Sequence, residues 1–343
     1  MTAAADVLSS ARRIADDLLF PAATTVDTAD RIPDGHLDAL AAAGLYGLGG
    51  PVSAGGLELD LAVFCDVIEI MAGGCLATTF VWLQHHGAVR ALMASDNAAL
   101  ARQWLEPLCR GSRRAGVALV GRLPGPALLR AEAVPGGYVF DGTAPWVTGW
   151  GMIDVLHTLA RDDDGNVIAA LLPVGPHGAS ITADRLELAA VNASATVSLR
   201  FSQHFVPAAL VSGLQPHSDL LASDASGLRV NGSLALGVAA RCCQLALAAD
   251  WSPAKALDRE LAAVRDALDA ADGSSLPAAR AAASAFAYRA AGLLAAAAGS
   301  QSVLVTAHPQ RLAREALFLL VFGSRPAIKA ELLRLLAGPA TSS

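Results

Sequence analysis

The strongest constraint on the fold is a block of short β-type runs between two long stretches with helical pattern. From residue 116 to about residue 210, apolar and β-branched residues form short runs separated by Gly, Pro, Asp and Asn. Closely spaced runs of this kind are typical of a small antiparallel barrel or sandwich. Before and after the block, apolar residues recur at helical spacing. The sequence therefore predicts an α+β multidomain chain, with an N-terminal helical domain at 1–115, a middle β-domain at 116–210 and a C-terminal helical bundle at 211–343.

Within the β block, residues 137–151 have an unusual composition of aromatic, hydroxyl and glycine residues. The pattern predicts a strand at residues 138–140, a tight turn at Asp141-Gly142 and a returning strand at residues 146–148. Trp146 and Thr148 in that strand precede two glycines, so an indole and a hydroxyl would stand beside exposed backbone. Such a wall suits a planar ring, and the alternative is an ordinary hairpin with a core tryptophan.

The flanking regions predict helices with recognisable ends. Pro21 is expected to end the first helix, and Gly44 is expected to end the second. A glycine-rich loop at residues 49–60 lacks the strand and the lysine of a phosphate-binding loop, so we interpret it as a structural turn. Alanine at contact positions lets the C-terminal helices approach closely, which favours a tight bundle. The helices are predicted at 9–19, 34–43, 61–72, 76–95, 97–108, 227–249, 254–271, 276–298, 308–322 and 327–337.

Composition excludes several classes of function. A net charge of −6 argues against a nucleic-acid partner, which would need a basic surface. The mean hydropathy is +0.45, but the most apolar run, residues 290–304, is interrupted by Gly, Ser and Gln, so we expect no membrane span. The N-terminal residues contain acids and no long apolar core, so we expect no secretory signal. Five cysteines in apolar surroundings predict reduced thiols and a cytoplasmic location.

Two polar clusters have a plain structural interpretation. His85 and His86 are adjacent on a predicted helix and would point about 100° apart, so they cannot jointly clamp one metal ion. We expect a hydrogen-bonded pair near a ligand cleft, and no histidine or cysteine pair has the spacing of a zinc site. The three aspartates at residues 162–164 are expected to form an exposed turn rather than a cation site.

Four stretches in the same order resemble the acyl-CoA dehydrogenase family. Pro51, Gly55 and Gly56 match the family's Pro-x-x-x-Gly-Gly loop, and residues 146–148 match its Trp-aliphatic-Thr/Ser sequence. Residues 192–207 are similar to the exit from the family's β-domain. Residues 308–316 resemble its Pro-x-Glu-Arg-Leu-x-Arg-Asp-Ala helix. The resemblance covers almost the full chain.

The resemblance implies FAD as cofactor and an acyl thioester such as acyl-CoA as substrate. Trp146, Val147 and Thr148 would lie against the isoalloxazine, and Val120 would offer backbone groups to the flavin edge. Gly299 and Ser300 would touch the FAD of a neighbouring subunit. The family reaction is α,β-dehydrogenation in fatty acid metabolism, with electrons passing to an electron-transfer flavoprotein or a similar acceptor. Because the family splits this site between subunits, we expect a homo- or hetero-oligomer.

The chain departs from the family pattern at residues that would carry chemistry. The family's Leu-Thr-Glu, which contacts flavin and substrate, is replaced here by Leu119, Val120 and Gly121. The glutamine before the family's Gly-Gly is replaced by Ala296. These replacements remove a hydroxyl, a carboxylate and an amide.

The largest departure is at the catalytic base. The position that carries the family's glutamate is Gly323, and a glycine cannot remove the α-proton of an acyl thioester. Some members place the glutamate on the first long C-terminal helix, but the start of that helix here, residues 226–231, has no acid. Asp224, just before it, is a candidate substitute. Glu315 is expected to be a structural partner of Arg311 on its helix.

Three functions therefore remain open, and no catalytic residue is assigned. The leading hypothesis is an FAD-dependent dehydrogenase of acyl thioesters. The alternatives are a non-catalytic subunit that pairs with a homologue carrying the glutamate, and a monooxygenase of the same fold. The third reaction needs no α-proton base, because reduced flavin reacts with oxygen instead. The sequence does not identify the acyl chain.

Overall fold

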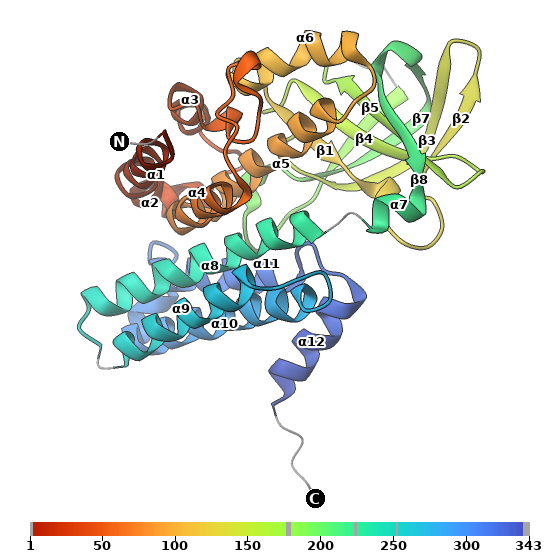
Figure 1. The fold of residues 1–343 in the computed structure, drawn as a ribbon. Coiled ribbons are helices and arrows are strands. Elements are labelled where there is room, and N and C mark those ends of the chain that lie inside the picture. Colours follow the sequence, from red (N-terminus) through yellow and green to blue (C-terminus); the bar gives the residue numbers. More distant parts are fainter. Residues whose placement is uncertain (1–2, 176–179, 223–224, 252, 339–343) are drawn as a thin grey trace, which may run out of the picture.

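A computed structural model describes residues 3–175, 180–222, 225–251 and 253–338 (Figure 1). The N-terminal helices and the sheet lie side by side, and the long C-terminal helices form a layer against them. The last helix extends away from this layer. Helix, sheet and helix thus follow one another in the predicted order, and the α+β class is confirmed.

The helices follow the apolar periodicity of the sequence. Most begin and end within a few residues of the predicted bounds, including α10, which matches them. Asn97 caps α6 by accepting a hydrogen bond from the backbone N–H of Leu100, at 3.1 Å. The helices are α1 Ala3–Arg13, α2 Phe20–Asp27, α3 Asp34–Ala42, α4 Leu61–Gly74, α5 Leu76–Met93, α6 Ala98–Cys109, α7 His217–Ala222, α8 Ala225–Ala248, α9 Ala254–Asp269, α10 Leu276–Ala298, α11 His308–Val321 and α12 Pro326–Ala337.

The β-domain is one mixed sheet. Within the described residues it has eight strands in the order β6-β7-β3-β2-β4-β5-β8, with β1 paired to β4 in parallel. Phe140 and Phe201 meet in its apolar core. The strands are β1 Ala115–Ala118, β2 Leu129–Val134, β3 Gly137–Val147, β4 Val155–Arg161, β5 Asn166–Pro173, β6 Ile181–Arg185, β7 Val197–Pro207 and β8 Val211–Pro216.

Pro21 does not end the first helix. A π-helical segment, Ile14–Leu19, leads directly into α2, and Pro21 lies in the first turn of α2. The helix continues through Pro21 because the π-helical segment directly before it changes the regular hydrogen-bond pattern at that point. The predicted stop at Pro21 is therefore wrong.

The predicted turn at Asp141-Gly142 is also wrong, because both residues lie inside β3. The hairpin between β2 and β3 turns before β3 begins, at Gly136, five residues before Asp141; the φ of Gly136 is +86°. Gly142 instead occupies an irregularity in the β3–β7 register, with φ +125°. A Cβ at this position would lie 2.2 Å from the carbonyl oxygen of Leu128, so only glycine fits.

Two strands were not predicted, β6 and β8. β8 begins at Val211, pairs with β5 and so belongs to the sheet although it follows residue 210. The residue bounds of the three domains stay a prediction. The turn at residues 162–166 joins β4 to β5 as expected, with the Asp162 N–H bonded to the Asn166 carbonyl at 3.0 Å.

Ion pairs lie within and between the helices of the two helical regions. Arg311 and Glu315 on α11 are almost fully buried, and Arg311 Nη1 donates to Glu315 Oε1 at 2.6 Å. The expected partnership of Glu315 and Arg311 is therefore confirmed. Glu69 on α4 accepts from Arg265 Nε on α9, at 3.1 Å to each carboxylate oxygen.

Two helical stretches within the described residues are long and apolar enough to cross a membrane by length and composition, residues 227–248 and 276–303. Core helices of globular proteins pass the same test. These two pack against each other, and α8 also packs against α4. We interpret them as the centre of the C-terminal bundle.

Candidate functional site

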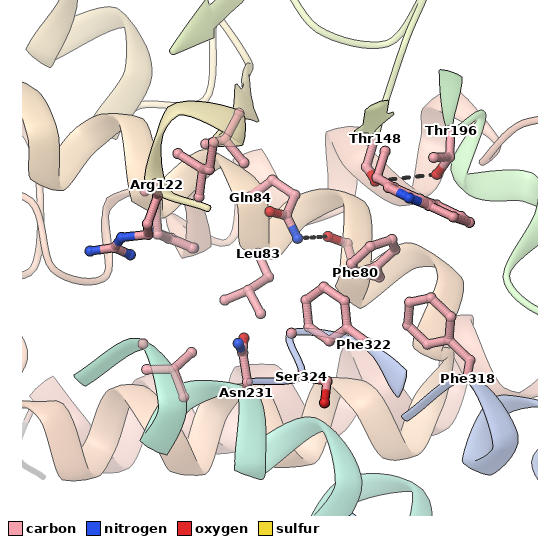
Figure 2. A pocket seen from close by; sticks show the side chains of 18 of the residues that line it. Phe80, Leu83, Gln84, Arg122, Thr148, Thr196, Asn231, Phe318, Phe322 and Ser324 are labelled. Carbon is pink, nitrogen blue, oxygen red and sulfur yellow. Dashed lines mark hydrogen bonds between the residues drawn. The ribbon is translucent and has the colours of Figure 1, made fainter. Parts of the chain in front are cut away.

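A cavity of about 1080 Å³ lies where the two helical regions meet the sheet. α5 supplies Phe80, Leu83 and Gln84 to its wall, and α8 supplies Asn231 from the opposite side (Figure 2). We call it the central cavity. Its remaining lining residues include Leu59, Phe64, His86, Arg90, Val120, Arg122, Trp146, Thr148, Leu188, Thr196, Gly227, Arg314, Phe318, Phe322, Gly323, Ser324 and Arg325.

Trp146 is a strained residue on this wall. Its φ is +63°, a left-handed conformation that bulky side chains rarely adopt, and its side chain is 65% exposed. The strain arises because the β3–β7 register shifts between Ala144 and Val147. The distortion turns the indole to the cavity while Val147 stays fully buried in the sheet core. Strain of this kind persists where the surroundings enforce it and is concentrated at functional sites.

Thr148 is held in place by a short chain of hydroxyl groups. Its Oγ1 lies 3.2 Å from Thr196 Oγ1 (Figure 2). Thr196 Oγ1 in turn lies 2.7 Å from Ser194 Oγ, and all three hydroxyl groups are buried. The Gly149 N–H donates to the Ser194 carbonyl at 2.8 Å, so the two segments are also joined through backbone. Ala195 between the hydroxyl residues has φ +47°. The Thr148 side of the wall is therefore pre-organised.

The segment after β1 brings backbone to the cavity. Val120 lines it and begins a 3₁₀ turn, Val120–Arg122. A Cβ on Gly121 would lie 2.7 Å from the Leu159 carbonyl oxygen on β4. The glutamate that the family carries here would therefore not fit without a backbone shift.

The position of the missing base is also built for glycine. Gly323 lines the cavity with φ +60°, and a Cβ there would lie 2.8 Å from Nδ2 of Asn231. Gly227, near the start of α8, lines the same cavity. Among the described lining residues there is no aspartate or glutamate. Asp224, the candidate substitute, lies outside the described residues.

The charged groups on the wall are basic. Arg90, Arg122, Arg314 and Arg325 line the cavity. Arg314 forms an ion pair with Asp27 of α2, and its Nη1 donates to the Ala189 carbonyl at 2.7 Å. This contact fixes the residue 188–190 edge of the cavity to α11.

His85 and His86 diverge as expected. Nδ1 of His85 accepts a hydrogen bond from the Ala115 N–H at 3.1 Å and so joins α5 to β1. His86 instead lines the cavity, with its ring edge-on to Phe64 and Trp82. Burial lowers the pKa of His85 to about 3 and holds the pKa of His86 well below its ordinary value. Both rings are therefore neutral at pH 7.

The comparisons with known proteins agree with this geometry. Residues 3–112 match the acyl-CoA dehydrogenase N-terminal domain. A mitochondrial short-chain specific acyl-CoA dehydrogenase from Bos taurus is 24% identical over 205 residues, which is 57% of this chain and 50% of the bovine protein. The N-terminal helical region therefore matches the acyl-CoA dehydrogenase family model, and the chain is similar in sequence to members of that family. It spans about half the length of this relative.

Solved structures of acyl-CoA dehydrogenases share the fold over almost the whole chain. Butyryl-CoA dehydrogenase from Megasphaera elsdenii superposes with a TM-score of 0.83 at 18% identity, covering 97% of this chain and 99% of that one. A glutaryl-CoA dehydrogenase from Mycobacterium smegmatis, in complex with FADH2, gives 0.83 at 16% identity, covering 100% and 96%. These likenesses concern the fold.

The acyl-CoA dehydrogenase resemblance predicted six residues that contact FAD, and three of them line the central cavity. Val120, Trp146 and Thr148 line it, whereas the Val147 side chain lies in the sheet core. Gly299 and Ser300 are exposed at the end of α10 and are not among the lining residues. Their assignment to a neighbouring subunit's FAD stays a prediction.

Sequence reasoning did not identify Asn231, Gln84 or the four arginines as lining residues. Each lies on a helix or a loop whose pattern fits an ordinary structural role. The position of Asn231, four residues after Gly227 on the same helix face, is a signal that could have been used.

Proposed function

We propose that this chain is an acyl-CoA dehydrogenase-like flavoprotein that binds FAD and an acyl thioester in the central cavity. The observation that carries the proposal is the strained, exposed Trp146 beside the fixed Thr148 on the cavity wall.

The residues fit FAD as a planar ring held by its face and edge. The Trp146 indole offers the face, the buried Thr148 hydroxyl is already oriented, and Val120 brings backbone groups to the same cavity. Aromatic contact of this kind favours planar ligands. When bound, FAD would accept the hydride that leaves the β-carbon of the acyl chain.

An acyl thioester fits the rest of the cavity. Phe80, Phe318 and Phe322 form an apolar side near Leu83, where an acyl chain would be shielded from water (Figure 2). Four arginines also line the wall, and a guanidinium group can bind the phosphate groups of a ligand. Acyl-CoA has both parts.

The α-proton requires a base, and the described lining provides none. His86 is neutral, but it lies on a different wall from Gly323 and no described carboxylate supports it. We therefore favour a chain that takes part in α,β-dehydrogenation as the non-catalytic subunit of a hetero-oligomer, with a homologue that carries the glutamate. A monooxygenase of the same fold is the second candidate, because the absence of a carboxylate from the described wall is equally compatible with its chemistry.

We also propose an electron acceptor and a cellular location. Electrons would pass to an electron-transfer flavoprotein or a similar acceptor. The five cysteines are free and buried, which supports a reducing compartment such as the cytoplasm.

The test is FAD retention. The purified chain is mixed with FAD, passed through a gel-filtration column and examined for flavin absorption. Close to one FAD per chain supports the proposal. A chain that stays colourless overturns it. If FAD is retained, separate runs with the electron acceptor and with oxygen distinguish dehydrogenase from monooxygenase chemistry.

A further inference from the structure

The amide of Asn231 lies next to residue 323, the position that the family resemblance assigns to the base. Its Nδ2 lies 2.8 Å from where a Cβ on residue 323 would be, so the amide fills space next to Gly323 that a side chain there would need. Figure 2 shows the amide pointing from α8 into the cavity, toward Leu83. A neutral amide therefore lies next to residue 323, the position at which the family pattern has a glutamate.

The Asn231 amide is available to a ligand. Within the described part of the chain, its side chain makes no hydrogen bond to another residue, although the residue is partly buried. A ligand that fills the cavity would displace water from the amide. The amide would then need a partner on the ligand, because burying an amide without one is unfavourable.

Gln84 on α5 supplies a second neutral amide. Its Nε2 donates to the Phe80 carbonyl at 3.2 Å, which leaves Oε1 as the free acceptor on the cavity side (Figure 2). Asn231 offers a donor, and Gln84 offers an acceptor. A hydroxyl group both donates and accepts, so it can satisfy amides of this kind, whereas a methylene group cannot.

We propose that Asn231 is a specificity-determining residue that selects acyl thioesters with a hydroxyl group close to the thioester, over thioesters with a plain alkyl chain. This inference rests on the proposed function, because it assumes that an acyl thioester binds in the central cavity. Nothing else in the described lining around Gly323 offers a side-chain donor that points into the cavity from α8.

The test compares two ligands on the FAD-loaded chain by isothermal titration calorimetry. Butyryl-CoA and 3-hydroxybutyryl-CoA differ by a single hydroxyl group. We expect the hydroxylated thioester to bind about tenfold more tightly. We expect Asn231→Leu to remove that preference by weakening the binding of the hydroxylated thioester more than the binding of butyryl-CoA.

The control is Gln244→Leu, the same kind of change at an exposed position of α8 away from the cavity, which should keep the preference. If Asn231→Leu does not fold, Asn231→Ala gives the same comparison. Equal affinity of the wild-type chain for both ligands, or an equal change for both in the variant, overturns the inference and leaves the proposed function intact. Failure of both thioesters to bind the FAD-loaded chain overturns the proposed function itself.

Discussion

Nδ2 of Asn231 lies 2.8 Å from the place where a Cβ on Gly323 would be. The two residues come from different helical segments, α8 and the turn between α11 and α12. The left-handed φ of Gly323, +60°, and the neighbouring amide oppose a side chain at the same position for independent reasons. Both the backbone conformation of residue 323 and its neighbour Asn231 are therefore suited to a glycine at this position.

This relationship predicts that Gly323→Glu alone will not create a dehydrogenase. The substitution places a side chain at positive φ, at a cost of about 1–2 kcal/mol, and against the Asn231 amide. The double variant Gly323→Glu with Asn231→Gly removes the contact. Flavin reduction by acyl-CoA, followed in a stopped-flow instrument, should be faster in the double variant than in Gly323→Glu. Equal rates would show that the Asn231 amide does not hinder a glutamate at residue 323.

Trp146 is predicted to affect stability and flavin binding differently. Trp146→Gly relieves the left-handed strain but increases the entropy of the unfolded chain, so the free energy of unfolding should change by less than about 1 kcal/mol. FAD affinity should fall about tenfold, because the aromatic face is lost. Trp146→Phe is the matched control and should keep most of the affinity. Fluorescence titration with FAD measures the FAD affinity of both variants. An unchanged affinity in Trp146→Gly would show that Trp146 is not part of the flavin site.

The Arg311–Glu315 pair should behave as a buried pair. Glu315→Leu leaves the Arg311 guanidinium buried without its carboxylate and should lower the free energy of unfolding by about 3–5 kcal/mol. Adding Arg311→Met should recover much of the loss. The exposed pair of Arg31 and Asp34, at 2.7 Å, is the comparison, and Asp34→Ala should cost at most about 1 kcal/mol. Urea unfolding measures all of these, and equal losses at both pairs would contradict the burial argument.

Buried histidines predict a loss of stability at mildly acidic pH. Burial, together with nearby Arg90 and Arg122, lowers the pKa of His157 in the folded chain to about 4 from 6.5. Below about pH 6.5 the unfolded chain takes up a proton that the folded chain does not, so stability is complete above this pH and falls as the pH drops toward 4. His85 and His86 act in the same direction.

The measurement is urea unfolding at several pH values between 7.5 and 5.5, chosen above the range in which carboxylates titrate (ordinary pKa about 4). His157→Phe should reduce the slope of unfolding free energy against pH by up to about 1.4 kcal/mol per pH unit. An unchanged slope in this variant would show that His157 is protonated in the folded chain.

Much of the fold follows from local sequence signals. The periodicity of apolar residues predicts the helices, and the Asp162–Asn166 turn predicts one hairpin. Asp141 and Gly142 resemble a turn in the same way, yet they lie inside β3. The difference depends on the Leu128 carbonyl close to Gly142, a contact that no local pattern reveals.

The site was predictable where it depends on one segment. Trp146 and Thr148 are close in sequence and both line the cavity, and the glycine at residue 323 is visible in the sequence as the lack of a base. The pairing of Gly323 with Asn231 could not be predicted, because it depends on how α8 is rotated against the turn after α11. The strain at Trp146 could not be predicted either, since it comes from the register between β3 and β7.

The most direct test of the account is to mix the FAD-loaded chain with acyl-CoA in the absence of oxygen and record the flavin spectrum. The account predicts a shift of the flavin bands without bleaching, because the thioester binds beside the flavin but the described wall has no carboxylate to remove the α-proton. Bleaching by the isolated chain would contradict it, and would show that a base outside the described lining completes the site.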